Sequence, residues 1–304
     1  MTASVIIPHL KSPATLPRTL ESVRAAAAGL QVEEILVEDV EARGAAWARN
    51  QGLARATGDA VFFVDADDTV APDFFSKPLA ALERSGADMC FFAFNDRPLA
   101  RDYNLDGNAQ VRDVLLPAFF GYSFESVRRW NAGGSLWQGR ELGYVWRVAL
   151  KRAFLERHAL RFDESLYICE DAAFLSACAV FADKTVSLDE SLYRHDENPH
   201  GTYRTVLNTR RHWDYKFAVK AFRERLDAQT GGAIWRYCAA SCVFSALELM
   251  RLWRPAGLTR REGRAALKRY LDDAKVHAAL RDFPLSWRHP LVAAAVLYLR
   301  SLAP

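Results

Sequence analysis

The sequence predicts an α/β fold, in which a mostly parallel sheet is covered by helices and followed by a C-terminal helical region. Over the first hundred residues, short β-branched or aromatic runs alternate with alanine-rich helical segments, a pattern typical of a parallel sheet covered on both faces. Beyond residue 204 the segments are helical, with breaks at Gly231, Pro255 and Pro284. We therefore expect two parts, residues 1–204 and residues 205–304.

Each element of the first half follows from a local pattern. Continuous apolar runs predict buried parallel strands, and alanine-rich or amphipathic segments that stop at glycine predict the helices between them. Residues 95–143 contain several glycines and are expected to be mostly irregular around a helix near 111–119. The expected strands are 4–8, 34–37, 60–64 and 87–94, and the expected helices are 16–28, 45–56, 72–84 and 170–181, with a strand and then a helix over 144–158.

Composition and length exclude several classes of protein. The formal net charge of +3 over 304 residues gives no indication of a nucleic-acid partner. The five cysteines are odd in number and lack the spacing of a zinc site. The N-terminus has no basic leader before an apolar core, so we expect no signal peptide and a cytoplasmic location. The sequence contains no run of about eighteen uncharged apolar residues, so we expect no membrane span.

Basic residues concentrate between Arg251 and Arg269, where Glu262 alone opposes them. Such a segment could meet an anionic phospholipid surface, although a solvated helix face gives the same pattern more often. Residues 233–253 and 290–299 are the most apolar segments of the second part. Either could lie on a membrane surface, but we expect both to be buried helices.

Three carboxylates, those of Asp65, Asp67 and Asp68, follow the apolar run 60–64. Carboxylates are costly to bury without a cation or water, and ligands of open α/β sheets bind beyond the carboxyl ends of the strands. Alternation along an extended chain would place Asp65 and Asp67 on the same side, and two oxygen ligands suit Mg²⁺ or Mn²⁺ together with phosphate oxygens. The cluster therefore predicts a cation and a diphosphate, with a plain acidic turn that caps the next helix as the alternative.

Two further polar segments are candidates for the same site. Glu170 and Asp171 stand at the start of an expected helix, where the helix dipole alone favours acids. The functional alternative is that Asp171 is a general base at the mouth of the cleft. Residues 193–202 are dense in polar side chains, and His195 or His200 could donate to a phosphate, complete a metal site or simply lie at the surface.

In their order and spacing, four stretches resemble the family 2 glycosyltransferases of the GT-A fold. They are residues 4–8, residues 48–58 with 63–68, residues 146–152 with 161–164, and residues 170–174. The resemblance covers about residues 3–204 and implies an inverting glycosyltransferase of the hexosyltransferase type. Such an enzyme moves a sugar from a nucleotide-sugar donor to a hydroxyl of a glycan or lipid-linked acceptor, in cell-surface polysaccharide synthesis. Residues 1–95 would then be the nucleotide-sugar half of the catalytic domain, and residues 96–204 the acceptor half.

The resemblance also implies a Mn²⁺ or Mg²⁺ cofactor and the roles of individual residues. Asp171 would be the catalytic base, which takes the proton of the acceptor hydroxyl. The implied donor-binding residues are Pro8, Asp39, Arg49, Asp65 and Asp67, the acceptor-side residues are Asp68, Trp146 and Glu170, and the metal ligands are Asp67 and His200.

One departure from the family pattern concerns the wall of the nucleotide site. Only residues 41–46 separate the second expected strand from the next helix, so a helix–strand unit of the family is missing. Two alternatives therefore stay open: a nucleotidyltransferase, although no glycine-rich, lysine-bearing phosphate loop supports it, and a catalytically inactive nucleotide-sugar-binding scaffold. The C-terminal helices could pack on the catalytic domain, touch the inner face of a membrane peripherally, or form a homodimer.

Overall fold

The structure, a computed structural model, describes residues 1–10, 12, 14–136, 143–196 and 205–303. The chain divides into an α/β unit, formed by Met1–Leu115 and Glu141–Asn198, and a helical unit, formed by Leu116–Arg140 and Pro199–Pro304. This division differs from the expected one near residue 204, because Leu116–Arg140 belongs to the helical unit. A segment from the middle of the sequence therefore contributes to the C-terminal part.

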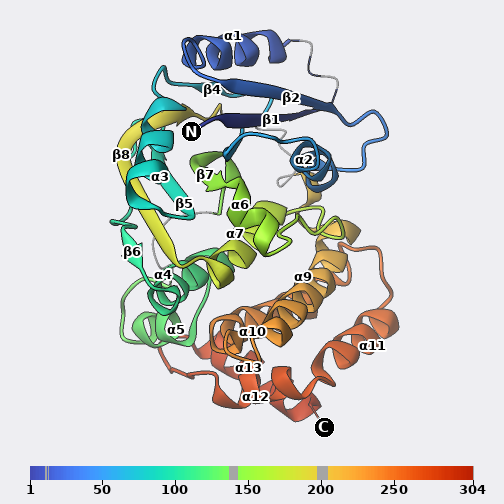
Figure 1. The fold of residues 1–304 in the computed structure, drawn as a ribbon. Helices are drawn as coiled ribbons and strands as arrows, with labels where there is room; N and C mark the ends of the chain where they lie inside the picture. The colour runs from blue at the N-terminus through green and yellow to red at the C-terminus, as the bar shows by residue number, and fades with distance from the viewer. Residues whose placement is uncertain (11, 13, 137–142, 197–204, 304) are drawn as a thin grey trace. The chain divides into compact units, whose positions relative to one another are not determined.

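An eight-stranded sheet forms the α/β unit, and the expected fold class is confirmed (Figure 1). The strand order is β2-β1-β3-β7-β5-β8-β4, and β6 pairs with β8. β1 is parallel to β2 and β3, β7 is antiparallel to β3 and β5, and β8 is parallel to β5. The strands are β1 (Ala3–His9), β2 (Val32–Glu38), β3 (Ala60–Phe63), β4 (Thr69–Val70), β5 (Met89–Phe94), β6 (Leu105–Asp106), β7 (Val148–Lys151) and β8 (Lys184–Arg194).

The helices of the α/β unit confirm most of the expected positions. α7 coincides with the expected helix at 170–181, whereas the helix expected at 72–84 begins only at Ser76. Residues 39–44 contain no helix or strand, which agrees with the short nucleotide wall. The helices are α1 (Leu16–Ala26), α2 (Ala45–Leu53), α3 (Ser76–Ser85), the 3₁₀ helix η1 (Val145–Arg147), α6 (Arg152–Arg157) and α7 (Glu170–Phe181), while α4 (Asn108–Phe120) crosses into the helical unit.

No local pattern predicted β8, which has eleven residues. Its sequence carries Asp189 and Glu190 and contains no continuous apolar run of strand length. β8 nevertheless pairs with β5 on one side and with β4 and β6 on the other. Pairing with neighbouring strands therefore decides this element, and it brings Tyr193 and His195 to the turn that follows β3.

An aromatic cluster in the core holds β3, the strand that precedes the acidic residues. Phe62 of β3 and the side chains of Phe74, Phe75 and Phe92 are fully buried, with ring centroids 4.9–5.5 Å apart in edge-to-face or tilted contacts. Such pairs contribute about 0.5–1.5 kcal/mol each beyond the burial of their area. The acidic turn at 65–68 therefore emerges from a rigid part of the sheet.

The helical unit packs around α10, and the expected burial of residues 233–253 is confirmed. α10 has eleven buried residues and contacts α5, α9, α11, α12 and α13. Among the described residues, none of the helices has the length and apolar character that crossing a bilayer requires. The helices are α5 (Phe124–Asn131), α9 (Arg210–Gln229), α10 (Trp235–Leu252), α11 (Arg260–Leu271), α12 (Ala274–Asp282) and α13 (Pro290–Leu302).

The expected burial of residues 290–299 is wrong for one face of the helix. α13 buries Ala293, Val296 and Leu299, but it leaves the side chain of Leu291 85% exposed. The sequence of α13 is apolar on both faces, so hydropathy predicted burial on both. The structure covers only one of them.

Candidate active site

A single buried guanidinium gathers three of the predicted site residues. Arg49 lies on α2 and is 3% exposed. Its Nη2 donates to Oδ1 of Asp65 at 2.9 Å, and its Nη1 donates to Oε1 of Glu170 at 2.9 Å and to Oδ1 of Asp171 at 2.6 Å. We call these four residues the Arg49 cluster. Three segments that are distant in sequence, namely α2, the turn after β3 and the start of α7, therefore meet at one cation.

The position of Arg49 depends on a close approach of α2 to β1. Gly52 faces the strand, and a Cβ built on it would stand 2.3 Å from Cγ2 of Ile6. Any larger residue would push α2 away from the sheet, so glycine is required by the close contact rather than by its backbone freedom. The packing of α2 on β1 thus sets where the guanidinium stands.

The Arg49 cluster carries an excess of negative charge. One guanidinium faces three carboxyl groups whose side chains are only 15–29% exposed. Burial raises the pKa of Asp171 to about 8; Arg49 opposes this rise, and Glu170 and Asp65 add to it. Burial lowers the pKa of Arg49, but the three carboxylates outweigh it and raise that pKa above its ordinary value. Asp171 can therefore hold or release a proton near neutral pH, as a general base must.

Asp171 is held at both carboxyl oxygens in the first turn of α7, where the helix dipole favours acids. Its Oδ2 accepts a hydrogen bond from the backbone N of Val145 at 3.3 Å. Cys169, just before this turn, has a φ of +57°, a left-handed conformation that is uncommon for a residue with a side chain. Backbone strain of this kind concentrates at functional sites.

The acidic residues after β3 form a tight turn, so the expected alternation of an extended chain is wrong for them. β3 ends at Phe63, and the backbone N of Asp68 donates to the O of Asp65 at 3.1 Å. Asp67 is half-buried, and no neighbouring side chain in the described part of the chain donates to its carboxylate. Burial, and then the charges of Asp68 and Asp65, raise the pKa of Asp67. A carboxylate in such surroundings gains from a nearby cation.

The donor set of this turn fits the predicted Mn²⁺ or Mg²⁺. Both ions prefer carboxylate oxygens and complete their coordination with water and phosphate oxygens, and Asp65 and Asp67 supply two carboxylates. Within the described ranges, no group of three or more His, Cys, Asp or Glu side chains could hold an ion unaided. Phosphate oxygens or residues outside those ranges would therefore complete the site. His200, the second predicted ligand, lies outside the described residues, and its role stays a prediction.

Asp68 is fully buried and ties the end of β8 to the acidic turn. Its Oδ2 accepts from the hydroxyl of Tyr193 at 2.6 Å and lies 3.3 Å from Nδ1 of His195, and its Oδ1 accepts from the backbone N of Asp196 at 2.8 Å. The Tyr193 hydroxyl also accepts from the backbone N of Asp65 at 3.1 Å. These contacts make Asp68 a positioning residue, and its expected place on the acceptor side stays a prediction.

Trp146 is a buried residue that packs against Tyr193 and His195, the two side chains that contact Asp68. It is 2% exposed and stacks on Tyr193 and Tyr144, with ring centroids 4.4 and 4.7 Å apart, and on His195 at 5.4 Å. The hydrogen bond to Asp68 raises the pKa of His195 despite its burial. The stack therefore holds a readily protonated imidazole beside the acidic turn, and contact of Trp146 with an acceptor stays a prediction.

Pro8 and Asp39 lie at the ends of the neighbouring strands β1 and β2. The backbone N of Asp39, just after β2, donates to the O of His9 on β1 at 2.9 Å. The Asp39 carboxylate accepts from the backbone N of Arg43 at 2.8 Å and of Gly44 at 2.7 Å. These bonds shape the loop that leads into α2. The expected contacts of Pro8 and Asp39 with a nucleotide stay predictions.

Three residues of the site had no sequence pattern that predicted them: Arg18, Thr19 and Tyr193. Arg18 Nη2 donates to the backbone O of Asp67, and Thr19 Oγ1 donates to the backbone O of Asp68, both at 2.7 Å. α1 thus clamps the acidic turn from a segment almost fifty residues earlier. The polar density of residues 193–202 was the one available signal near Tyr193.

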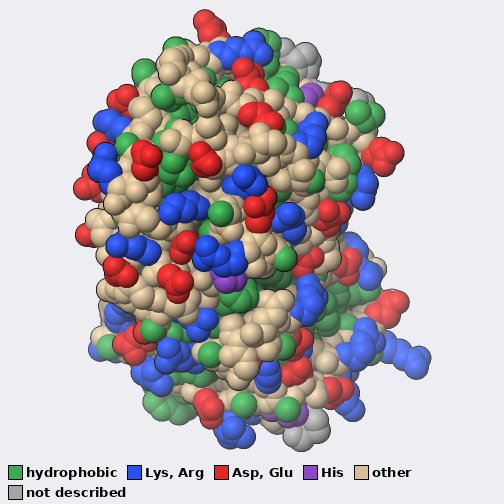
Figure 2. Space-filling view, in the orientation of Figure 1, with side chains coloured by type: hydrophobic (Ala, Val, Ile, Leu, Met, Phe, Trp, Pro, Cys, Tyr) green, Lys and Arg blue, Asp and Glu red, His purple; other side chains and the backbone are tan. Residues whose placement is uncertain are grey.

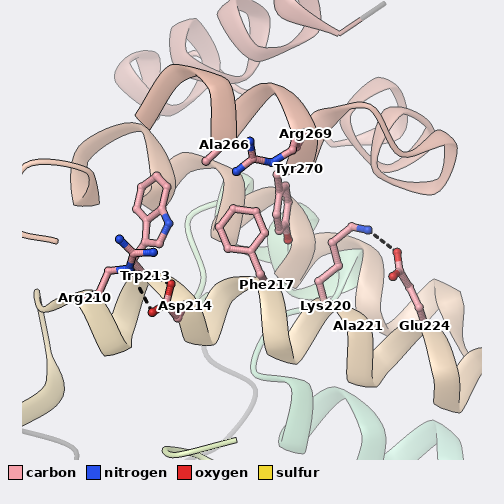
Figure 3. Close-up of a pocket in the computed structure, with 10 residues that line it drawn as sticks. All are labelled: Arg210, Trp213, Asp214, Phe217, Lys220, Ala221, Glu224, Ala266, Arg269 and Tyr270. Atoms are coloured by element: carbon pink, nitrogen blue, oxygen red, sulfur yellow. Dashed lines mark hydrogen bonds and ion pairs between the residues drawn. The ribbon is translucent and has the colours of Figure 1, made fainter. Parts of the chain in front are cut away.

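The helical unit contains a separate pocket of about 460 Å³ between α9 and α11 (Figure 3). Aromatic side chains form much of its wall, namely Trp213, Phe217 and Tyr270. Two ion pairs, Arg210–Asp214 and Lys220–Glu224, also line it. None of the predicted site residues that the structure describes lines this pocket, so it is distinct from the Arg49 cluster.

Sequence comparisons give a family match and several relatives for part of the chain. Residues 40–106 match the sequence model of the family described as glycosyl transferase family 2. The chain is 29% identical over 51% of its length to the uncharacterized glycosyltransferase EpsJ of Bacillus subtilis, and 27% identical over 57% of its length to the succinoglycan biosynthesis protein ExoO of Rhizobium meliloti. The matches cover 43% and 54% of these proteins, so the chain spans about half the length of the curated relatives it matches.

The fold is similar to that of a solved structure, S. aureus TarS 1–349 in complex with UDP-GlcNAc. The TM-score is 0.52 at 15% sequence identity, and the likeness covers 100% of this chain and 82% of that one. At this identity the likeness shows the fold alone, while the family match favours a glycosyltransferase over the nucleotidyltransferase alternative. Together, the family match over residues 40–106, the partial relatives and the shared architecture support a family 2 glycosyltransferase region, within a fold similar to that of TarS 1–349.

Proposed function

We propose that this chain is an inverting glycosyltransferase of the hexosyltransferase type, which moves a sugar from a nucleotide-sugar donor to a hydroxyl of a glycan or lipid-linked acceptor. One observation carries the proposal: a single guanidinium binds both Asp65 of the acidic turn and Asp171 at the start of α7. The turn is where the donor diphosphate would bind, and Asp171 is the proposed base. Arg49 thus couples the donor side of the site to the acceptor side.

The proposed reaction is a single displacement. The acceptor oxygen bonds to the anomeric carbon while the bond from that carbon to the diphosphate oxygen breaks, so the configuration inverts. Asp171 takes the proton of the acceptor hydroxyl, and the nucleoside diphosphate leaves with the bonding electrons. Burial raises the pKa of Asp171, which makes its carboxylate a stronger base than an exposed aspartate, and the side chain keeps 15% of its surface exposed for the acceptor.

Asp65 and Asp67 would hold the Mn²⁺ or Mg²⁺, with His200 as a further ligand. When bound, a divalent ion supplies positive charge that offsets the charge of the diphosphate. Arg18 and His195 also touch the acidic turn, and as cationic groups they would bind phosphate oxygens.

The remaining predicted residues have more indirect roles in this proposal. Pro8 and Asp39 would border the nucleotide at the ends of β1 and β2. Asp68 and Trp146 would act by holding the imidazole of His195 in place, since both contact it and both are buried. Their substitution should therefore weaken donor binding rather than remove the base.

The names of the similar proteins narrow the substrates to test. One relative is named as a succinoglycan biosynthesis protein, and TarS 1–349 was solved with UDP-GlcNAc. For this chain we accordingly propose a step in the synthesis of a cell-surface polysaccharide, with UDP-sugars as the first donors to test. A cytoplasmic location, with peripheral contact at the inner face of a membrane where a lipid-linked acceptor would lie, belongs to the same proposal.

Donor turnover and donor binding, measured separately, test this function. Release of nucleoside diphosphate from a panel of nucleotide sugars is followed with Mn²⁺ and after chelation, and binding is measured by calorimetry. Asp171→Asn should abolish turnover and keep donor binding, whereas Asp189→Asn, at an exposed position on β8, should change neither. Full turnover by Asp171→Asn would refute the role of this base. Donor binding without turnover in the unchanged chain would favour the scaffold alternative.

A further inference from the structure

Charge is distributed very unevenly between the two units. The helical unit, residues 116–140 and 199–304, contains 22 Lys and Arg against 9 Asp and Glu, a net charge of +13. The α/β unit contains 18 against 28, a net charge of −10. Figure 2 shows Lys and Arg side chains projecting from the surface where α11 lies in Figure 1. The basic segment noted in the sequence is therefore part of a unit-wide positive charge that the total of +3 conceals.

α13 presents an uncovered apolar face on this positive unit. Leu291, Tyr298 and Leu302 are spaced seven and four residues apart, which places them on one face of the helix, and they are 85%, 47% and 39% exposed. Trp287, in the turn before α13, is 84% exposed. We call these four residues the apolar stripe. Single exposed apolar side chains are ordinary, but an aligned set of them marks an interaction surface.

Basic side chains border the apolar stripe at its N-terminal end. Arg288, which is exposed, directly follows the tryptophan of the stripe. The next residue, His289, stacks on Trp130 of α5, and this helix carries the exposed cations Arg128 and Arg129. An apolar face with an aromatic residue and flanking arginines is typical of helices that lie in a membrane interface.

We propose that the helical unit docks onto an anionic phospholipid bilayer through the apolar stripe, with α13 lying in the plane of the interface. The 13 residues of α13 extend over about 20 Å, which is too short to span a hydrocarbon core of about 30 Å. A second copy of the chain fits this face less well, because dimerisation through it would bring two units of +13 together. Anionic lipids instead neutralise that charge.

This inference deepens the proposed function by naming its membrane partner. Docking would confine the enzyme to the surface in which a lipid-linked acceptor diffuses, and this consequence rests on the proposed function. Bilayer binding itself needs no transfer chemistry, because the apolar stripe belongs to the helical unit and the Arg49 cluster to the α/β unit. The two proposals can therefore be tested independently.

Co-sedimentation of the full 304-residue chain with vesicles tests the docking. Vesicles of phosphatidylcholine are compared with vesicles in which about a quarter of the lipid is phosphatidylglycerol, and we expect clear partition onto the anionic vesicles only. Raising NaCl from about 50 to about 500 mM should weaken this partition, because salt screens the attraction. The double variant Trp287→Ser with Leu291→Ser should lower it roughly 10- to 100-fold, because both side chains leave water on docking.

Two matched controls separate the stripe from general surface effects. Val40→Ser removes a 69% exposed apolar side chain from the α/β unit and should leave partition unchanged. Arg288→Glu should lower partition roughly fivefold per unit of charge changed, whereas Arg84→Glu makes the same change at an exposed position of α3 and should have little effect. All the replaced side chains are exposed, so every variant should keep the circular dichroism spectrum of the unchanged chain.

The results of these experiments either support or overturn the docking of the apolar stripe onto a bilayer. No partition of the unchanged chain onto anionic vesicles would overturn the inference, as would equal partition of the stripe variant. The inference would also be overturned if the unchanged chain formed a dimer without binding vesicles and the stripe variant were a monomer. That result would show that the apolar stripe contacts a second copy of the chain. Donor turnover by the stripe variant without vesicles should equal that of the unchanged chain. Vesicle binding by a chain that shows no donor turnover would count against the proposed function alone.

Discussion

Replacing Arg49 by methionine tests whether one cation holds the active site together. Methionine keeps an apolar stem of similar length but removes the three charged hydrogen bonds of 2.6–2.9 Å. Three carboxyl groups, 15–29% exposed, then lose their common partner. Removing one partner from a buried ion pair costs about 3–5 kcal/mol, a large share of the total of about 5–15 kcal/mol that keeps a typical domain folded.

Urea unfolding followed by circular dichroism measures this loss. With a dependence of about 2 kcal/mol per molar urea, a loss of 3–5 kcal/mol lowers the midpoint by roughly 1.5–2.5 M. Arg24→Met is the matched control, since Arg24 binds Glu34 with its side chain 61% exposed. Water already solvates and screens that exposed pair, so its removal should hardly move the midpoint.

The pH dependence of the loss separates charge repulsion from packing. Arg49 lowers the pKa of Asp171 against the raising effect of burial, so in Arg49→Met this folded-state pKa rises further above the unfolded value. Protonation then favours the folded variant at low pH, and stability is lost as the pH rises toward the folded-state pKa. Asp171 of the unchanged chain itself stays mostly protonated up to about pH 8, so the gap between the unchanged chain and the variant should widen mainly above that pH, and be smaller near pH 7 than near about pH 9.5. An equal gap at both pH values, or a midpoint change as small as that of Arg24→Met, would refute the reasoning.

Three other outcomes concern the base and its supports. The raised pKa of Asp171 predicts that kcat/KM rises with pH and levels off above about 8. Glu170→Gln removes a charge that raises this pKa, so the profile of kcat/KM against pH should move to lower pH. A profile that does not move would contradict the assignment of Asp171 as the base. Gly58→Ala places a Cβ 2.4 Å from the backbone of β1 and should lower the unfolding free energy by about 1–3 kcal/mol in urea. Tyr193→Phe removes a donor to the buried carboxylate of Asp68 and should cost about 1–3 kcal/mol, whereas a neutral change would show that its other partners suffice.

The local sequence pattern was sufficient to predict the strands whose side chains are all buried. β1, β3 and β5 are continuous apolar runs buried on both faces, and their positions followed from hydropathy. The carboxylates at 65–68 were visible because carboxylates are costly to bury at the end of an apolar strand, and those at 170–171 because they open an expected helix. The chemistry of the candidate site could therefore be predicted, although the turn that presents Asp65 and Asp67 could not.

Tertiary contacts alone decided how these pieces meet. Arg49 finds its partners 16, 121 and 122 residues away, and nothing in the sequence of α2 marks it as their common cation. β8 is a strand because β5 lies beside it, and Tyr193 reaches Asp68 only through that pairing. α13 carries apolar side chains on its exposed face as well as on its buried face. The sequence shows whether each side chain is polar or apolar. Which residue it contacts, and which segment buries it, depend on the distant segments that the fold places beside it.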